Sequence, residues 1–295
     1  MKLATIDLDD PVHYADFGGT GAPLVLIHGL GGSLTNWLAV AEGLTSRFRV
    51  FAPDLIGFGR TPLAGRKPGI PEQSAMLARF LEHVGGGPAV VVGNSMGGLV
   101  AVQLAADHPA LVSRIILVSA ALPRELGTRV DGTVALMFAL YMTPFLGEAV
   151  LRRRAAAMGP EGVLRDTMRL CGVDPDALPA HTIDRSVALI EGREDVPAMD
   201  KAFLDAARSL LRLLIDPRRY RQAMESIQAP VLLVQGDEDR LVPAAAARDV
   251  AARLPHWQYL ELPGVGHVPQ LQVPDQVATE VLAWLAATAE ARTNS

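Results

Sequence analysis

Short apolar runs that end in turn residues recur in the first and last thirds of the chain. Six of them are LVLIHG (24–29), RVFAPD (49–54), AVVVGN (89–94), RIILVS (114–119), VLLVQG (231–236) and QYLELP (258–263). Continuous apolar runs of this length, as opposed to alternating ones, are typical of strands buried on both faces. We therefore predict a buried strand at each of the six.

Helical patterns lie between these runs, over residues 35–46, 72–84 and 96–108, and another closes the chain over 274–290. Alternation of strands and helices predicts an α/β fold with a mostly parallel central sheet and helices on both faces. The sequence contains no internal repeat with a period of 20–50 residues, so a repeat architecture is not expected.

The strand pattern stops after Pro123 and returns at residue 231. The stretch 124–221 holds amphipathic segments of helix length, 14 of the 24 arginines and five of the nine methionines. We therefore expect residues 1–121 and 222–295 to form one α/β core. Residues 122–221 should form a helical cap over the carboxyl ends of its strands. The arginine run 152–154 is typical of a solvated helix face, the alternative being contact with an anionic surface.

Composition limits the function classes. The chain has 295 residues, 49% of them hydrophobic and 20% charged, which is ordinary for a globular protein. A net charge of −5 argues against a dedicated nucleic-acid binder, because such proteins neutralise phosphates. The single cysteine, Cys171, excludes an internal disulfide and a cysteine-based metal site.

Two uncharged stretches and the N-terminus bear on location. MKLATIDLDD has three aspartates where a secretory signal needs an apolar run. Residues 83–106 are long enough to span a bilayer, but their glycines and Pro88 favour a strand, a turn and a helix start. Residues 132–147 are shorter and contain Pro144, which favours a buried or interfacial cap helix. We therefore expect no stable membrane span and a cytoplasmic location, and nothing here indicates an oligomeric state.

The segment GNSMGG (93–98) fits the pattern G-x-S-x-G between a predicted strand and a predicted helix. A serine on so sharp a turn has a strained backbone and needs small neighbours, which Gly93 and Gly97 supply. The N-terminus of the following helix favours developing negative charge. Ser95 is therefore the candidate nucleophile, and a plain glycine-rich turn is the alternative.

A second glycine-rich loop, HGLGGS (28–33), follows another predicted strand. Such a loop can direct backbone N–H groups at an oxyanion. We expect His28 to orient this loop by hydrogen bonding.

A serine hydroxyl needs a base, and seven histidines compete for that role. His267 lies in the loop PGVGHVPQ directly after the last predicted strand, where open α/β sheets place their sites. The others fit structural or surface positions better: His13, His28, His83, His108, His181 and His256.

The acid that orients the base should come from GDEDRLVP (236–243), again after a predicted strand. Asp237, Glu238 and Asp239 all compete, and we favour Asp239, deeper in the loop and just before the helix that Pro243 begins. The order Ser95, Asp239, His267 is the order expected for this architecture.

Together these segments resemble the α/β-hydrolase superfamily. HGLGG, DLIGFGRT (54–61), GNSMGG, GDEDRLVP and GVGHVPQ occur in the family's order and approximate spacing, and the insert corresponds to its variable cap. The resemblance implies an α/β-hydrolase fold with Ser95 as nucleophile, Asp239 as acid and His267 as base. It pairs the N–H groups of Leu30 and Met96 as an oxyanion hole and gives Asp54 a turn-shaping role. Thr61 stands where the family often has serine.

The resemblance also ranks the branches of the superfamily. Ser95 stands where dehalogenases and epoxide hydrolases carry aspartate, and Leu30 where perhydrolases generally carry an aromatic residue. C–C bond hydrolases often share the GNSMGG turn but usually have HGxGPG in the oxyanion loop and tryptophan where Val268 stands. A serine esterase or lipase-like enzyme without cofactor or metal is therefore implied. The alternatives are a C–C hydrolase acting on a vinylogous diketone and a hydrolase-like binding protein.

The cap should contribute the substrate pocket. Its methionines and aromatic residues favour an adaptable apolar wall, although packing of the cap onto the core would also explain them. The expected pocket residues are Met137, Phe138, Tyr141, Met142, Phe145 and Val268. We therefore expect a small apolar ester as substrate.

Overall fold

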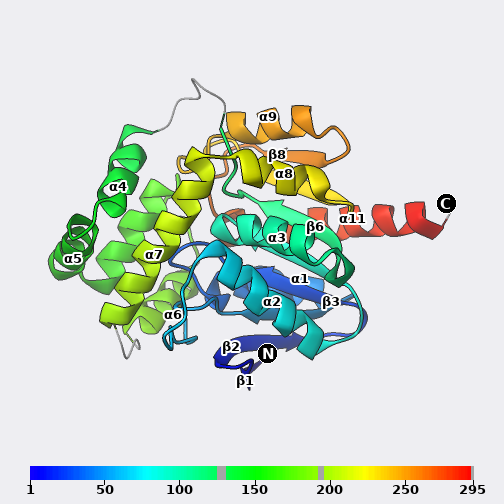
Figure 1. Ribbon diagram of the computed structural model, residues 1–295, viewed down its shortest axis with the longest axis horizontal. Helices are drawn as coiled ribbons and strands as arrows, with labels where there is room; N and C mark the ends of the chain where they lie inside the picture. The colour runs from blue at the N-terminus through cyan, green and yellow to red at the C-terminus, as the bar shows by residue number, and fades with distance from the viewer. Residues whose placement is uncertain (125–130, 192–195, 294–295) are drawn as a thin grey trace.

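The computed structural model describes residues 1–124, 131–191 and 196–293 (Figure 1). Its centre is an eight-stranded sheet in the order β1-β2-β4-β3-β5-β6-β7-β8. The strands are β1 (Lys2–Asp7), β2 (Pro11–Gly18), β3 (Pro23–Ile27), β4 (Arg49–Pro53), β5 (Ala89–Asn94), β6 (Val112–Val118), β7 (Val231–Gly236) and β8 (Gln258–Leu262). Strands β3 to β8 pair in parallel, and β1 and β2 form an antiparallel edge.

Helices connect and cover these strands. They are η1 (Leu34–Trp37), α1 (Leu38–Leu44), α2 (Ile70–Val84), α3 (Met96–Asp107), η2 (Pro109–Leu111), α4 (Gly132–Met142), α5 (Leu146–Leu170), α6 (Ala180–Glu191), α7 (Val196–Ile215), α8 (Arg218–Ser226), α9 (Ala244–Arg253), α10 (Pro269–Gln272) and α11 (Pro274–Thr293).

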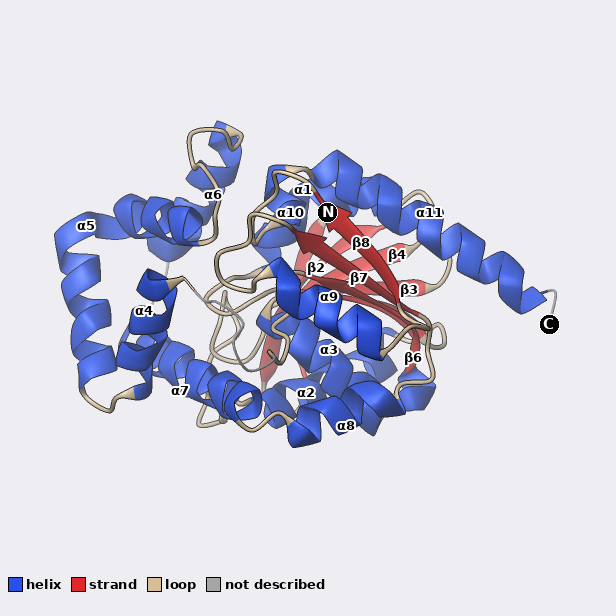
Figure 2. Cartoon of the chain, turned by 90° about the horizontal axis from the view of Figure 1, so that it is seen from above, coloured by secondary structure: helices blue, strands red, loops and turns tan. Residues whose placement is uncertain are grey.

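Both faces of the sheet are covered, as Figure 2 shows. Successive side chains of a strand point to opposite faces. Leu24 and Leu26 of β3 accordingly pack with α1 and α11, whereas Val25 and Ile27 pack with α2, α3, α8 and α9. This double burial is why the strands are apolar throughout, and it confirms the predicted α/β class with a mostly parallel central sheet and helices on both faces.

All six predicted strands are present, with ends within two residues of the expected ones. The β1–β2 hairpin was not predicted. Its strands are only partly buried and mix polar with apolar residues, so they carry no continuous apolar signal. The hairpin extends the sheet beyond β4.

Between β6 and β7 every regular element in the described part of the chain is a helix. Helices α4 to α7, called the cap helices below, lie beside the sheet, while α8 packs on α3 of the core (Figure 1). On this basis we propose the division into a core and a 122–221 cap. Residues 125–130 and 192–195 of that range lie outside the described residues.

No single described helix combines the length and the apolar composition needed to cross a bilayer. Helices α4 and α5 meet those criteria only as a pair, and they are bent by 119° at the turn between them. That turn contains Pro144, and α4 ends at Met142 before it.

Candidate active site

Ser95 lies on the turn between β5 and α3 with φ 54° and ψ −118°, a conformation that non-glycine residues rarely adopt. The turn is fixed on both sides: the Ser95 N–H donates to Val118 O (3.1 Å), and Ser95 O accepts from the N–H groups of Gly98 and Ala121 (both 3.0 Å). A Cβ atom on Gly97 would lie 2.4 Å from Ile27 O, so this turn can only form with a glycine there.

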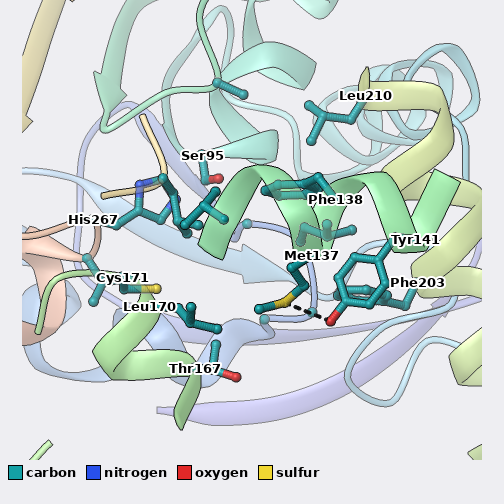
Figure 3. A pocket seen from close by; sticks show the side chains of 18 of the residues that line it. Ser95, Met137, Phe138, Tyr141, Thr167, Leu170, Cys171, Phe203, Leu210 and His267 are labelled. Carbon is teal, nitrogen blue, oxygen red and sulfur yellow. Dashed lines mark hydrogen bonds between the residues drawn. The ribbon is translucent and has the colours of Figure 1, made fainter. Parts of the chain in front are cut away.

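His267 and Asp239 form a buried pair at the carboxyl ends of β8 and β7. His267 Nδ1 lies 2.7 Å from Asp239 Oδ2, and the residues are 3% and 6% exposed. This contact leaves Nε2 as the ring nitrogen available to the cavity that His267 lines. Ser95 and His267 lie at one end of that cavity (Figure 3).

Backbone and side-chain donors orient the Asp239 carboxylate. Its Oδ1 accepts from the N–H groups of Leu241 (2.9 Å) and Val242 (2.8 Å), and its Oδ2 accepts from Gln235 Nε2 (2.9 Å). Asp237 is placed differently: it is exposed, and its Oδ1 accepts from the Gly264 N–H at 2.7 Å. The structure therefore brings Asp239, and not Asp237, to the histidine.

The HGLGGS loop runs directly against the serine, since a Cβ atom on Gly29 would lie 3.0 Å from Ser95 Cβ. His28 holds this loop. Its Nδ1 contacts Gly29 O at 2.8 Å, and its Nε2 contacts the Leu55 N–H at 3.0 Å. Because a carbonyl only accepts and an N–H only donates, the ring must be neutral with its proton on Nδ1. Burial lowers the pKa of His28, which agrees with a neutral ring.

Asp54 ties the neighbouring segments together. Its Oδ1 accepts from the Leu34 N–H (2.8 Å), and its Oδ2 accepts from the Arg60 N–H (2.9 Å) and contacts His13 Nδ1 (2.9 Å). Asp54 thus links strand β2 to the end of the HGLGGS loop and holds the turns around it in place.

A cavity of about 800 Å³ opens between this site and the cap helices. Five of the expected pocket residues line it: Met137, Phe138, Tyr141, Met142 and Val268. Phe203 also lines it and stacks edge-on against Tyr141, with ring centroids 5.3 Å apart (Figure 3). A cavity of this size with mostly apolar walls is typical of small-molecule sites.

Phe145 differs from the expectation, because it is not among the residues that line this cavity. It stands at the turn between α4 and α5 with φ 64°, and it is 88% exposed. Its side chain is therefore exposed to solvent and does not form part of the cavity wall.

Three contacts at the site were not foreseen from the sequence. Asn94 Nδ2 donates to His267 O at 3.1 Å, Gln235 supports Asp239, and Cys171 O accepts from the His267 N–H at 2.7 Å. Asn94 stands inside the GNSMGG motif, so its position next to Ser95 was a usable signal. The Cys171 thiol itself is buried, and burial raises its pKa, so it is poorly suited to act as a nucleophile.

In the part of the chain that the structure describes, no group of three or more histidine, cysteine or acidic residues could hold a metal ion. The site therefore consists of a serine at a strained turn, a hydrogen-bonded histidine–carboxylate pair, a glycine-rich loop and an apolar cavity.

Comparison with known proteins places the chain in a family. The dihydrolipoyllysine-residue acetyltransferase component of the acetoin cleaving system of Pseudomonas putida is 30% identical over 279 residues. The match covers 93% of this chain but only 66% of that protein. The pimeloyl-[acyl-carrier protein] methyl ester esterase of Aromatoleum aromaticum is 32% identical over 267 residues, covering 86% of this chain and 94% of the esterase.

Solved structures agree on the fold. The crystal structure of E-2-(acetamidomethylene)succinate hydrolase matches with a TM-score of 0.74 at 20% identity, covering 97% of this chain and 99% of that one. The model of the alpha/beta hydrolase family matches residues 24–280, which is most of the chain. The protein therefore belongs to the alpha/beta hydrolase family.

Proposed function

We propose that this protein is a serine hydrolase that cleaves carboxylic esters with apolar acyl groups. One observation carries the proposal: His267, bonded to Asp239 at 2.7 Å, shares one cavity with Ser95 on its strained turn. A nucleophile, a base and a carboxylate that orients the base are the three parts of a catalytic triad. The similarity to a methyl ester esterase supports ester chemistry.

In the proposed reaction, Ser95 Oγ attacks the ester carbonyl while His267 Nε2 takes its proton. The N–H groups of Leu30 and Met96 hold the oxyanion, and Asp239 stabilises the imidazolium that forms. His267 then protonates the leaving alcohol, which leaves an acyl group on Ser95. Water attacks this acyl-enzyme with His267 again as base, and the acid and free Ser95 result.

The acyl preference rests on the cavity wall. Met137, Phe138 and Met142 of α4 line the cavity together with Phe203 of α7. Each methylene group buried against such a wall can contribute up to ~0.8 kcal/mol of binding free energy. We therefore expect kcat/KM to rise with the length of the acyl chain.

The test is a series of p-nitrophenyl esters from acetate to octanoate, assayed with the wild-type protein and with Ser95→Ala. We expect kcat/KM to rise along the series, a burst of nitrophenol from the wild type, and loss of turnover in the variant.

A flat or falling series would reject the apolar acyl preference. Full activity in Ser95→Ala would reject the nucleophile. Cleavage of a vinylogous diketone ring-fission product without ester turnover would favour a C–C hydrolase instead.

A further inference from the structure

Helix α4 is apolar on every side. Its sequence, GTVALMFALYM, contains no charged residue, and only Val134 and Tyr141 are buried in the structure. A helix of this kind is ordinarily buried completely or placed at an interface. One side of α4 lines the cavity through Met137, Phe138 and Met142, so the other side needs a separate explanation.

Exposed apolar side chains occur on α4, at its turn into α5 and at the start of α5, a segment called the apolar corner below. Leu136 is 61% exposed, Phe145 at the turn 88%, and Leu146 at the start of α5 43%. Among the described residues seven large hydrophobic side chains are exposed. Four belong to the cap helices, Leu136, Leu146, Met158 and Ile215, and Phe145 lies at the turn between α4 and α5. In Figure 1, α4 and α5 lie at the end of the molecule farthest from the C-terminus.

The charges beside this corner are positive. Arg152 and Arg153 are exposed, and Arg153 follows Leu146 by seven residues, which places both on one side of α5. Between Gly132 and Met158 the sequence has a single acid, Glu148, and this acid is 3.2 Å from Arg208 of α7. Arg154 is paired as well, with Asp166 at 2.7 Å.

We propose that Leu136, Phe145 and Leu146, with Arg152 and Arg153, dock this protein on an anionic lipid surface. Apolar side chains flanked by arginines match a membrane boundary, where acyl chains lie beneath negative headgroups. A second copy of the chain fits less well. A two-fold interface would oppose the same patch to itself and bring these arginines close to their own counterparts.

The docking surface extends the proposed function, on which this step rests. Only helix α4 lies between the docking surface and the cavity. Esters that dissolve in lipid would therefore reach Ser95 over a short path. The substrate class would then be esters whose acyl chains partition into membranes.

Binding can be measured without turnover by sedimenting Ser95→Ala protein with vesicles. The vesicles contain phosphatidylcholine alone or phosphatidylcholine with phosphatidylglycerol. We expect binding to the anionic vesicles, weaker binding to the neutral ones, and release in high salt. Phe145→Ser with Leu146→Ser should weaken binding at least tenfold. Arg152→Gln with Arg153→Gln should weaken it roughly fivefold per arginine.

Matched controls come from elements outside α4 and α5. Leu3→Ser removes an exposed apolar side chain from β1, and Arg218→Gln with Arg219→Gln removes an exposed arginine pair from α8. Neither should change vesicle binding. Absence of binding, or equal losses in these controls, would overturn the proposal. So would a dimer in light scattering that the Phe145 and Leu146 substitutions dissociate.

Hydrolysis of soluble p-nitrophenyl butyrate separates this proposal from the proposed function. In an otherwise wild-type background the Phe145 and Leu146 substitutions should leave it unchanged, since neither residue lines the cavity. Vesicle binding without ester turnover would reject the enzyme activity alone, and turnover without vesicle binding would reject the docking surface alone.

Discussion

The backbone N–H of His267 donates a hydrogen bond of 2.7 Å to the carbonyl oxygen of Cys171. Cys171 is the C-cap residue directly after α5, so the end of a cap helix is hydrogen-bonded to the loop that carries the proposed base. On the other side, Asn94 Nδ2 donates to His267 O at 3.1 Å. The histidine backbone is thus held between the cap and the strand that leads to Ser95, and the cap does more than cover the cavity.

The turn after Cys171 should be sensitive to a single added methyl group. Gly172 has φ +76°, and a Cβ atom there would lie 2.3 Å from Glu238 O in the loop that holds Asp239. We expect Gly172→Ala to lower the free energy of unfolding by about 2 kcal/mol and kcat for ester hydrolysis by about tenfold or more. Urea unfolding and steady-state kinetics would measure the two effects.

Gly65→Ala is the matched control. Gly65 also has positive φ (76°), but it does not line the cavity and nothing lies within 4 Å of the added Cβ atom. It should cost some stability through backbone strain while leaving kcat near the wild-type value. Equal loss of kcat in both variants would contradict a specific role for the turn after Cys171.

Asn94 should matter for both stability and rate. It is 3% exposed, and its Nδ2 serves two buried carbonyl oxygens, those of Val118 and His267. Asn94→Ala removes both hydrogen bonds, each worth about 1 kcal/mol, and frees the His267 backbone to shift. We expect a lower midpoint in urea and a lower kcat. Gln103→Ala, which removes an exposed amide on α3 bonded to Asp107, should change neither.

The strands and the site loops could be predicted because each has a recognisable pattern in the local sequence. A strand buried on both faces must be apolar throughout, and the loops at its carboxyl end carry the polar residues of the site. No local sequence pattern indicates the contact between Cys171 and His267. It joins backbone atoms of residues nearly a hundred positions apart, and any residue type could supply a carbonyl oxygen there.

Phe145 shows a second limit. A segment that is apolar on every side has no periodicity to separate its inward from its outward face. Composition alone therefore grouped Phe145 with Phe138, although the bend between α4 and α5 places them differently.

The choice between neighbouring acids can be tested by exchange for amides. Asp239→Asn should lower kcat roughly 10³- to 10⁴-fold, because an amide beside His267 Nδ1 no longer stabilises the imidazolium or fixes its tautomer. Asp237→Asn should keep nearly full activity, because Asp237 is exposed and its carboxylate accepts from the Gly264 N–H, whereas His267 is paired with Asp239. The reverse ranking of kcat would move the acid to Asp237.

Acid should destabilise the fold partly through His28. Burial lowers the pKa of His28 below its ordinary value of 6.5. Above pH 6.5 the ring is neutral in both the native and the unfolded protein. The contribution of His28 to the free energy of unfolding is then fully present. Below pH 6.5 the unfolded chain binds a proton that the native site excludes, so this stabilisation is lost as the pH falls toward the native pKa. The loss contributed by this one group cannot exceed about 1.4 kcal/mol per pH unit.

The test compares the wild type with two variants. For each protein the free energy of unfolding in urea is measured at pH 7.5 and at pH 5.5. His28→Gln removes the titrating ring, so its stability should depend less on pH than that of the wild type, although it is lower at both values. His256→Gln removes an exposed histidine and should keep the wild-type dependence. If the His28 variant lost as much stability between the two pH values as the wild type, protonation of His28 would not contribute to acid sensitivity. The HGLGGS loop would then have to tolerate a charged ring, in conflict with the acceptor role of Nε2 toward the Leu55 N–H.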